Sequence, residues 1–218
     1  MKKQIIENNI VKLAGIVRGV PMVTHELEGE KFWEFSLEIK RLSGVSDILP
    51  ITVPEKLLEL SNLTLTEGVA LYIEGEFRSY NKIVNEKSKL ILSIFAKDIK
   101  PTSEECESDE NYITLTGFIC KQPIYRTTPF NREICDAILA VNRKNFKSDY
   151  LPLISWGRNA KYLENLSVGT KIAVDGRIQS RVYTKIVDGI PEERTAYEVS
   201  VQKLNNLAKI EDSGFVGA

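Results

Sequence analysis

Apolar and polar residues alternate in short runs along most of the chain, and Gly, Pro or Asn residues separate these runs. Alternation with a period of two places every second side chain on the same face, which is the pattern of a half-buried β-strand. In the C-terminal half it predicts strands at 111–120, 133–143, 149–156, 170–183 and 195–204. A segment of helical character, 158–166, follows the third of these strands.

The same pattern occurs a second time in the N-terminal half. The segment DILP begins at Asp47 and DYLP begins at Asp149, which is 102 residues later. At the same offset, FSLEIKR (35–41) aligns with AILAVNR (137–143). Glycines that frame six residues recur at an offset of 101, as Gly68 and Gly75 in the first half and as Gly169 and Gly176 in the second. Self-similarity at a fixed offset indicates a duplication. We therefore predict a first domain at 1–102 and a second at 111–207.

Five strands with a single helix after the third, in fewer than 100 residues, are typical of the five-stranded Greek-key barrel called the OB-fold. The predicted fold class is thus all-β, with two tandem OB-folds. Concave sheet faces and loops of this fold bind oligonucleotides or oligosaccharides. The fold alone does not select between them.

Composition and charge add limits. The chain has no apolar run of about 18 residues, the length of a membrane span, and its first ten residues lack the apolar core of a signal peptide. Three cysteines without a CxxC pair argue for reduced thiols inside a cell and against zinc. Residues 103–110 carry five acids and no base, which predicts a solvated linker, whereas 111–207 has 14 basic and 9 acidic residues. The second copy is therefore the candidate for an anionic partner.

Strand parity places cations and rings on one face of the second copy. In KIAVDGRIQSRVY (171–183), four polar or aromatic residues alternate with the apolar ones; they are Arg177, Gln179, Arg181 and Tyr183. Tyr150 and Trp156 share one side of their strand, and Phe146 lies in a loop among Arg143, Lys144 and Lys147. Cations bind phosphates and bases stack on rings, so this surface fits a single-stranded nucleic acid.

Each residue also has a structural alternative. Trp156 could cap the barrel, Tyr183 could close a hairpin, and Arg177 and Arg181 could be solvated cations of a sheet. Trp33 shares parity with Phe35, Leu37 and Ile39, so we expect it in the core. We expect His25, the single histidine, to be exposed and uninvolved.

The second copy resembles the bacterial single-stranded-DNA-binding proteins over nearly all of 111–207. The segments that carry this resemblance are LTGFICKQPIYRTTPFNRE, AILAVNR, YLPLISWGRNA, VGTKIAVDGRIQSRVY and AYEVSV. The stacking aromatics of the family correspond to Phe146, Tyr150, Trp156 and Tyr183. The resemblance implies non-catalytic coating of single strands by four OB-folds, with little sequence preference and no cofactor.

The first copy keeps the framework and loses the rings. Ile48, Pro54 and Lys82 stand at the positions of Tyr150, Trp156 and Tyr183, and Glu76 stands at that of Arg177. We therefore expect the second copy to dominate affinity. The full set of predicted contacts is Phe146, Tyr150, Trp156, Tyr183, Arg143, Lys144, Lys147, Arg177, Gln179, Arg181, Arg126, Arg41, Arg78, Tyr80 and Lys82.

The expected function is binding and protection of single-stranded DNA in replication, recombination or repair. We expect a homodimer, which supplies four OB-folds, in the cytoplasm of a bacterial cell or with a phage or plasmid inside it. The acidic tail with a Pro-Phe tip, through which the family recruits proteins, is not found in the short tail 208–218. One alternative is a replication or primosome accessory module that mainly binds protein. An enzyme is the least favoured class, because the sequence has no paired carboxylates at a fixed spacing, phosphate-binding Gly loop or metal-ligand cluster.

Overall fold

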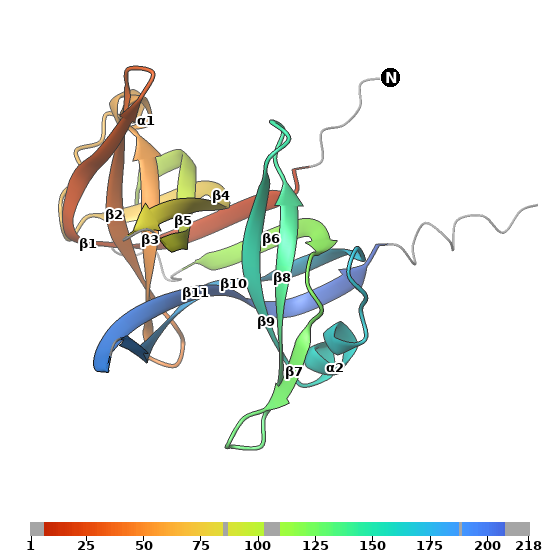
Figure 1. Cartoon of the computed structure of the whole chain (residues 1–218). Helices are drawn as coiled ribbons and strands as arrows, with labels where there is room; N and C mark the ends of the chain where they lie inside the picture. The colour runs from red at the N-terminus through yellow and green to blue at the C-terminus, as the bar shows by residue number, and fades with distance from the viewer. Residues whose placement is uncertain (1–6, 85–86, 103–109, 188, 208–218) are drawn as a thin grey trace, which may run out of the picture. The chain divides into compact units, whose positions relative to one another are not determined.

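The computed structural model describes residues 7–84, 87–102, 110–187 and 189–207, and these residues form mainly β-strands (Figure 1). The predicted all-β class is confirmed. Most of the predicted linker, 103–109, and the tail, 208–218, lie outside the described residues.

The first barrel has five strands and one short helix. They are β1 (Asn9–Leu27), β2 (Glu30–Lys40), β3 (Ser46–Pro54), α1 (Glu55–Leu60), β4 (Ala70–Val84) and β5 (Lys87–Pro101). The strands are hydrogen-bonded in the order β2-β3-β5-β4-β1, and pairing of β2 with β1 closes the barrel. This is the OB-fold order, in which β3 and β5 run parallel and the other neighbours run antiparallel.

The second barrel repeats this order with one extra strand. Its elements are β6 (Asn111–Ile119), β7 (Ile124–Thr127), β8 (Glu133–Asn142), β9 (Ser148–Trp156), α2 (Arg158–Glu164), β10 (Lys171–Val187) and β11 (Ile190–Asn206). The order is β6-β10-β11-β9-β8, closed by pairing of β6 with β8, and β7 extends the edge beyond β8. The five predicted strands and the helix are present, whereas β7 was not predicted.

The alternating pattern fills both barrel interiors. In β3, Leu49, Ile51 and Val53 are fully buried, and in β9 Leu151 and Leu153 are buried in the same way. The recurring glycines have a steric reason. A Cβ added at Gly75 would clash with the carbonyl oxygen of Phe95, and one at Gly176 with that of Ser200. Both positions therefore require the close approach of two backbones that only glycine permits.

The chain divides into two compact units whose bounds differ from those of the sequence repeat. One unit contains Val11–Tyr112 together with Ile178–Glu198, and the other contains Ile113–Arg177 with the described residues before Val11 and after Glu198. The described part of 178–198, which we call the β10–β11 arm, thus packs with the first barrel. There Ser180 donates its N–H to Asp47 at 2.7 Å, and its Oγ accepts the N–H of Ile48 at 3.0 Å.

Two expectations about single residues have different outcomes. Trp33, expected in the core, is only half-buried, because its indole N–H points to Glu55 Oε1 at 3.3 Å. That expectation was wrong. His25 is exposed as predicted, and its ring stacks on Phe32 with centroids 4.7 Å apart. No helix among the described residues is long and apolar enough to cross a membrane.

Candidate nucleic-acid interface

Strand β9 presents two rings on its outer face. Tyr150 and Trp156 keep 48% and 40% of their surface exposed, whereas Leu151 and Leu153, on the opposite face, are buried. The antiparallel register with β8 pairs Tyr150 with Ala140 and Trp156 with Ile134. The parity predicted for these rings is confirmed, and 40% of the Trp156 surface remains accessible to a ligand.

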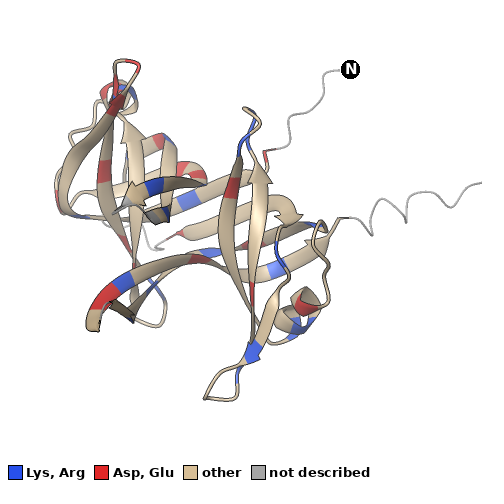
Figure 2. Ribbon diagram, viewed as in Figure 1, with Lys and Arg blue, Asp and Glu red and all other residues tan. Residues whose placement is uncertain are grey.

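The loop between β8 and β9 adds a third ring and two cations. The Arg143 N–H donates to the Lys147 carbonyl oxygen at 2.7 Å and closes the loop. Phe146 has φ of 62° and is fully exposed, with no core to enter. Lys144 and Lys147 are also exposed, and the basic residues at this hairpin tip are visible in Figure 2. Rings and ammonium groups therefore share one hairpin.

Two predicted contacts, Arg143 and Arg41, bind acids of their own barrels. Arg143 donates to both carboxylate oxygens of Asp149, with Nε at 2.8 Å from Oδ2. Arg41 binds Asp47 in the same way, with Nε at 2.7 Å from Oδ2 and Nη2 at 2.5 Å from Oδ1. Both carboxylates are buried, at 0% and 1% exposure. These arginines have a structural role, and any contact with phosphate would be in addition to it.

The predicted row on β10 is divided at Gln179. Arg177 is half-buried and belongs to the second barrel's unit, whereas the residues from Ile178 onward belong to the β10–β11 arm. Gln179 is 8% exposed and donates its amide to Glu198 at 2.8 Å. The guanidinium of Arg181 lies 5.6 Å from the ring centroid of Tyr183, which is 37% exposed. Arg181 and Tyr183 are thus neighbours on the arm, in a different unit from the rings of β9.

The other predicted residue of the second barrel, Arg126 on β7, is exposed. It forms an ion pair with Asp136 of β8 at 2.8 Å. An exposed pair of this kind contributes little to stability. Its guanidinium therefore stays accessible to solvent at the barrel edge.

Apart from Arg41, the predicted contacts of the first barrel lie on β4. Tyr80 and Lys82 are exposed. Arg78 donates to Glu76 Oε2 from two nitrogens, at 3.0 and 2.8 Å, and its guanidinium lies 3.7 Å above the ring centroid of Phe95. Burial raises the pKa of Glu76, but hydrogen bonds from Lys97 and Arg78 outweigh it and hold that pKa below its usual value.

Two rings on the outer face of the first barrel were missed by sequence reasoning. Phe32 of β2 and Phe95 of β5 are half-buried, and their centroids are 6.2 Å apart. The signal was present in the alternation, because Phe32 has the opposite parity to Phe35, which faces the core. The comparison of repeats drew attention only to positions that carry rings in the second copy.

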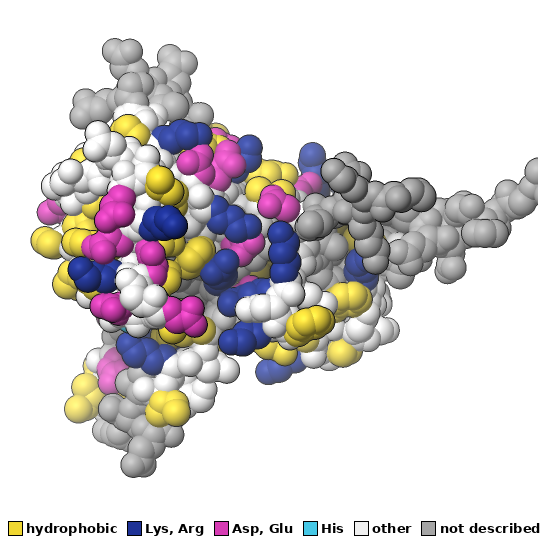
Figure 3. Space-filling model, turned by 90° about the horizontal axis from the view of Figure 1, so that it is seen from above, with side chains coloured by type: hydrophobic (Ala, Val, Ile, Leu, Met, Phe, Trp, Pro, Cys, Tyr) yellow, Lys and Arg dark blue, Asp and Glu magenta, His cyan; other side chains and the backbone are white. Residues whose placement is uncertain are grey.

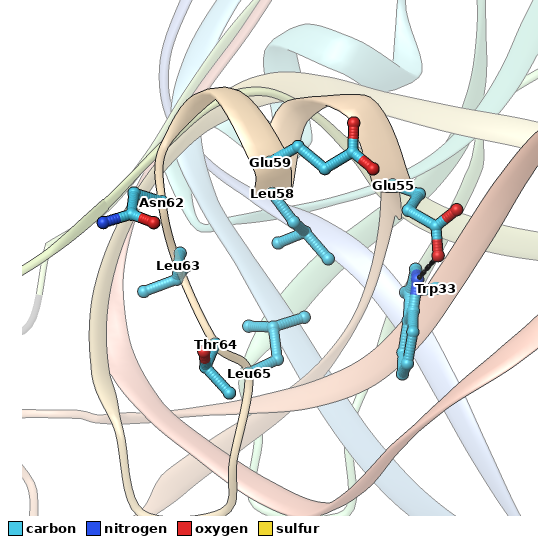
Figure 4. Close-up of a pocket in the computed structure, with 8 residues that line it drawn as sticks. All are labelled: Trp33, Glu55, Leu58, Glu59, Asn62, Leu63, Thr64 and Leu65. Carbon is cyan, nitrogen blue, oxygen red and sulfur yellow. Dashed lines mark hydrogen bonds between the residues drawn. The ribbon is translucent and has the colours of Figure 1, made fainter.

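A pocket on the first barrel lies apart from these faces. It is lined by Trp33 and by residues of α1 and the segment that follows, namely Glu55, Leu58, Glu59, Asn62, Leu63, Thr64 and Leu65. In Figure 4, Leu58 and Leu65 lie between Leu63 and Trp33, and the indole N–H of Trp33 is bonded to Glu55. Among the described residues, no group of three His, Cys, Asp or Glu side chains could hold a metal ion.

In the view of Figure 3, Lys and Arg are interspersed with Asp, Glu and hydrophobic side chains, so no single sign of charge dominates that face.

Comparison with known proteins gives consistent results. Residues 110–207 match the model described as the single-strand binding protein family. The chain is similar to Single-stranded DNA-binding protein 1 of Staphylococcus aureus (strain COL), with 38% identity over 80 residues, covering 34% of this chain and 48% of that protein. Single-stranded DNA-binding protein A of Bacillus subtilis (strain 168) is 34% identical over 80 residues, which cover 34% of this chain and 46% of that protein. The chain thus spans about half the length of the curated relatives it matches.

Among solved structures, the chain is similar to the wild-type single-stranded DNA binding protein from Thermus aquaticus. The TM-score is 0.70 at 21% sequence identity, covering 91% of this chain and 92% of that chain. A deletion mutant of the same protein gives a TM-score of 0.73 at 20% identity, covering 91% and 93%. At this identity the likeness establishes the fold alone.

Proposed function

We propose that this chain, whose residues 110–207 match the model of the single-strand binding protein family, binds single-stranded DNA with little sequence preference. The observation that carries the proposal is the set of three exposed rings on one hairpin of the second barrel, Phe146, Tyr150 and Trp156. Every base has a π-face, so stacking on such rings tolerates any sequence, and each stacked base contributes about 1–3 kcal/mol.

The cations of the hairpin supply the second part of the interaction. Lys144 and Lys147 are exposed on both sides of Phe146. Phosphates neutralised by these side chains release counterions, which makes affinity fall as salt rises. Duplex DNA keeps its bases stacked on each other and cannot use the rings. The site therefore favours single strands over duplex.

The assembly we propose is a homodimer with four OB-folds. Most soluble homo-oligomers are closed and two-fold, and the duplication places two barrels in one chain. Coating of single strands would serve replication, recombination or repair, in the cytoplasm of a bacterial cell or with a phage or plasmid in it. Catalysis has no part in this proposal.

The test is a fluorescence titration with a thymine oligomer and with a duplex of equal length, at two salt concentrations. The chain has two tryptophans, Trp33 in the first barrel and Trp156 in the second, and stacking on Trp156 is expected to quench its emission. The slope of log affinity against log salt should be about −0.7 per neutralised phosphate. Equal affinity for single strand and duplex would refute the proposal.

The proposed homodimer has its own test. A mass measurement in dilute solution should give about twice the mass of one chain.

A further inference from the structure

The first barrel has a ring cluster of its own, assembled from four strands. The His25 ring of β1 stacks on Phe32 of β2, with centroids 4.7 Å apart and planes within 6°. Phe32 meets Phe95 of β5 at 6.2 Å with a tilt of 44°. The guanidinium of Arg78, on β4, covers the Phe95 ring at 3.7 Å. We call these four residues the Phe32–Phe95 cluster.

The cluster lies on the face of the first barrel that corresponds to the ring face of the second. The register pairs Phe32 with Pro54, which occupies the position of Trp156 in the repeat, and pairs Phe95 with Thr52 on the same side of β3. The first barrel has thus lost the ring on its third strand and carries rings on the two strands beside it.

The second barrel has no counterpart of these two rings. By the register of the strands, Ile134 stands at the position of Phe32 and Ser200 at that of Phe95, and both are buried. The core of an OB barrel therefore does not need aromatic rings at these positions. Phe32 and Phe95 are extra aromatic surface, and both remain half-exposed.

The guanidinium of Arg78 is fixed in its stacked position. Two hydrogen bonds to Glu76 Oε2 hold it, and Lys97 binds the other carboxylate oxygen of Glu76. The negative charge of Glu76 is therefore compensated by two cations. An Arg plane stacked on a ring is itself a surface on which a base can stack, and its N–H groups reach phosphate. The reversal from Arg177 to Glu76, which the sequence comparison takes as a loss, instead positions Arg78.

We propose that the Phe32–Phe95 cluster is a second stacking site for bases of a single strand, so that the first barrel binds DNA through rings at positions different from those of the second. The inference rests on the proposed function. It assigns the first barrel a larger part than the loss of rings at Ile48, Pro54 and Lys82 predicts.

The experiment compares full-length variants that keep volume or charge. Phe32→Leu and Phe95→Leu keep apolar packing and remove the ring, and Arg78→Lys keeps the charge and removes the plane. The control is Phe118→Leu, because Phe118 is an exposed Phe of β6 that belongs to neither ring set. Each variant is titrated with a long thymine strand and with a short oligomer that one barrel accommodates, and the length of strand covered per protein is measured.

Each cluster variant should shorten the covered length and lower the affinity for the long strand by about fivefold to a hundredfold, the equivalent of one stacked base. Affinity for the short oligomer, held by the second barrel, and the behaviour of Phe118→Leu should not change. If all variants cover the same length with wild-type affinity, the cluster is only packing and the inference is wrong. Urea denaturation checks that each variant is folded. If a Leu variant unfolds, the affinity and covered length of Arg78→Lys provide the test of the inference. A wild-type chain that binds no single strand would instead refute the proposed function itself.

Discussion

Arg41 holds Asp47 through Nε and Nη2, across the loop that joins β2 to β3. The carboxylate is buried at 0% exposure and also accepts the N–H of Ser180. Arg143 and Asp149 form the same pair in the second barrel. The recurrence of the Asp in DILP and DYLP thus has a physical cause. A carboxylate buried at the start of the third strand needs a guanidinium six residues earlier to compensate its charge.

Breaking this pair should destabilise the second barrel. We expect Asp149→Asn to lower the free energy of unfolding by about 3 kcal/mol, because removal of one partner leaves the other charge uncompensated in a largely buried site. Urea denaturation measures the change. The control is Asp136→Asn, whose pair with Arg126 is exposed on both sides and should contribute less than about 1 kcal/mol. Equal effects of the two substitutions would contradict the structural role of the Arg143–Asp149 pair.

The rings of β9 should carry binding energy in the second barrel. Trp156→Ala and Tyr150→Ala should each weaken single-strand binding by about 1–3 kcal/mol, measured by fluorescence anisotropy of a labelled thymine oligomer. Ile48→Ala, at the position of Tyr150 in the repeat, should leave affinity unchanged. If Ile48→Ala cost as much binding as Tyr150→Ala, the stacking role of the β9 rings would be refuted.

The stability of the first barrel should depend on the ionisation of Glu76. Hydrogen bonds from Lys97 and Arg78 hold its folded pKa below the ordinary 4.5, although burial opposes them. A lowered folded pKa gives stability that is present above about pH 4.5 and is lost as pH falls through the folded pKa. The urea concentration at the unfolding midpoint should therefore decrease when the pH is lowered below 4.5. The Glu76→Gln variant should show a smaller decrease over the same pH range. Parallel curves for the two proteins would show that Glu76 does not contribute.

The thiol of Cys135 should react slowly. Burial, with smaller contributions from Asp136 and Glu164, raises its pKa to about 11. The reactive thiolate is therefore scarce near neutral pH. Alkylation followed by mass spectrometry of peptides should find Cys135 labelled far more slowly than free cysteine, and labelled readily in denaturant. Rapid labelling of the native protein would mean that β8 opens locally.

Local pattern was sufficient for the fold of each barrel. Alternation along the chain predicted the strands and the outward parity of Tyr150 and Trp156, because side-chain direction in a strand depends only on position along it. Strand β7 was missed because IYRT (124–127) is too short for a clear alternation. The predicted strand at 170–183 ended too early, because β10 continues to Val187 with exposed apolar residues such as Val182 and Ile186.

The candidate site depended on relationships that parity does not contain. Parity placed Gln179 on the outer face, yet β11 brings Glu198 beside it and both are buried. The alternation along β2 could have placed Phe32 on the outer face, but it does not indicate that Phe95 lies between Phe32 and Arg78.

The sequence by itself determined the duplication, the all-β class and the exposed rings of β9, because each follows from spacing or alternation within a short segment. Only the tertiary structure decided that Arg143 and Arg41 hold buried acids, that the β10–β11 arm packs with the first barrel, and that Phe32, Phe95 and Arg78 meet. The physical reason is that strand register and packing decide which side chains meet, both in the Arg–Asp pairs six residues apart and in contacts between residues far apart in the chain. Those contacts depend on the free energy of the whole fold and not on any local pattern.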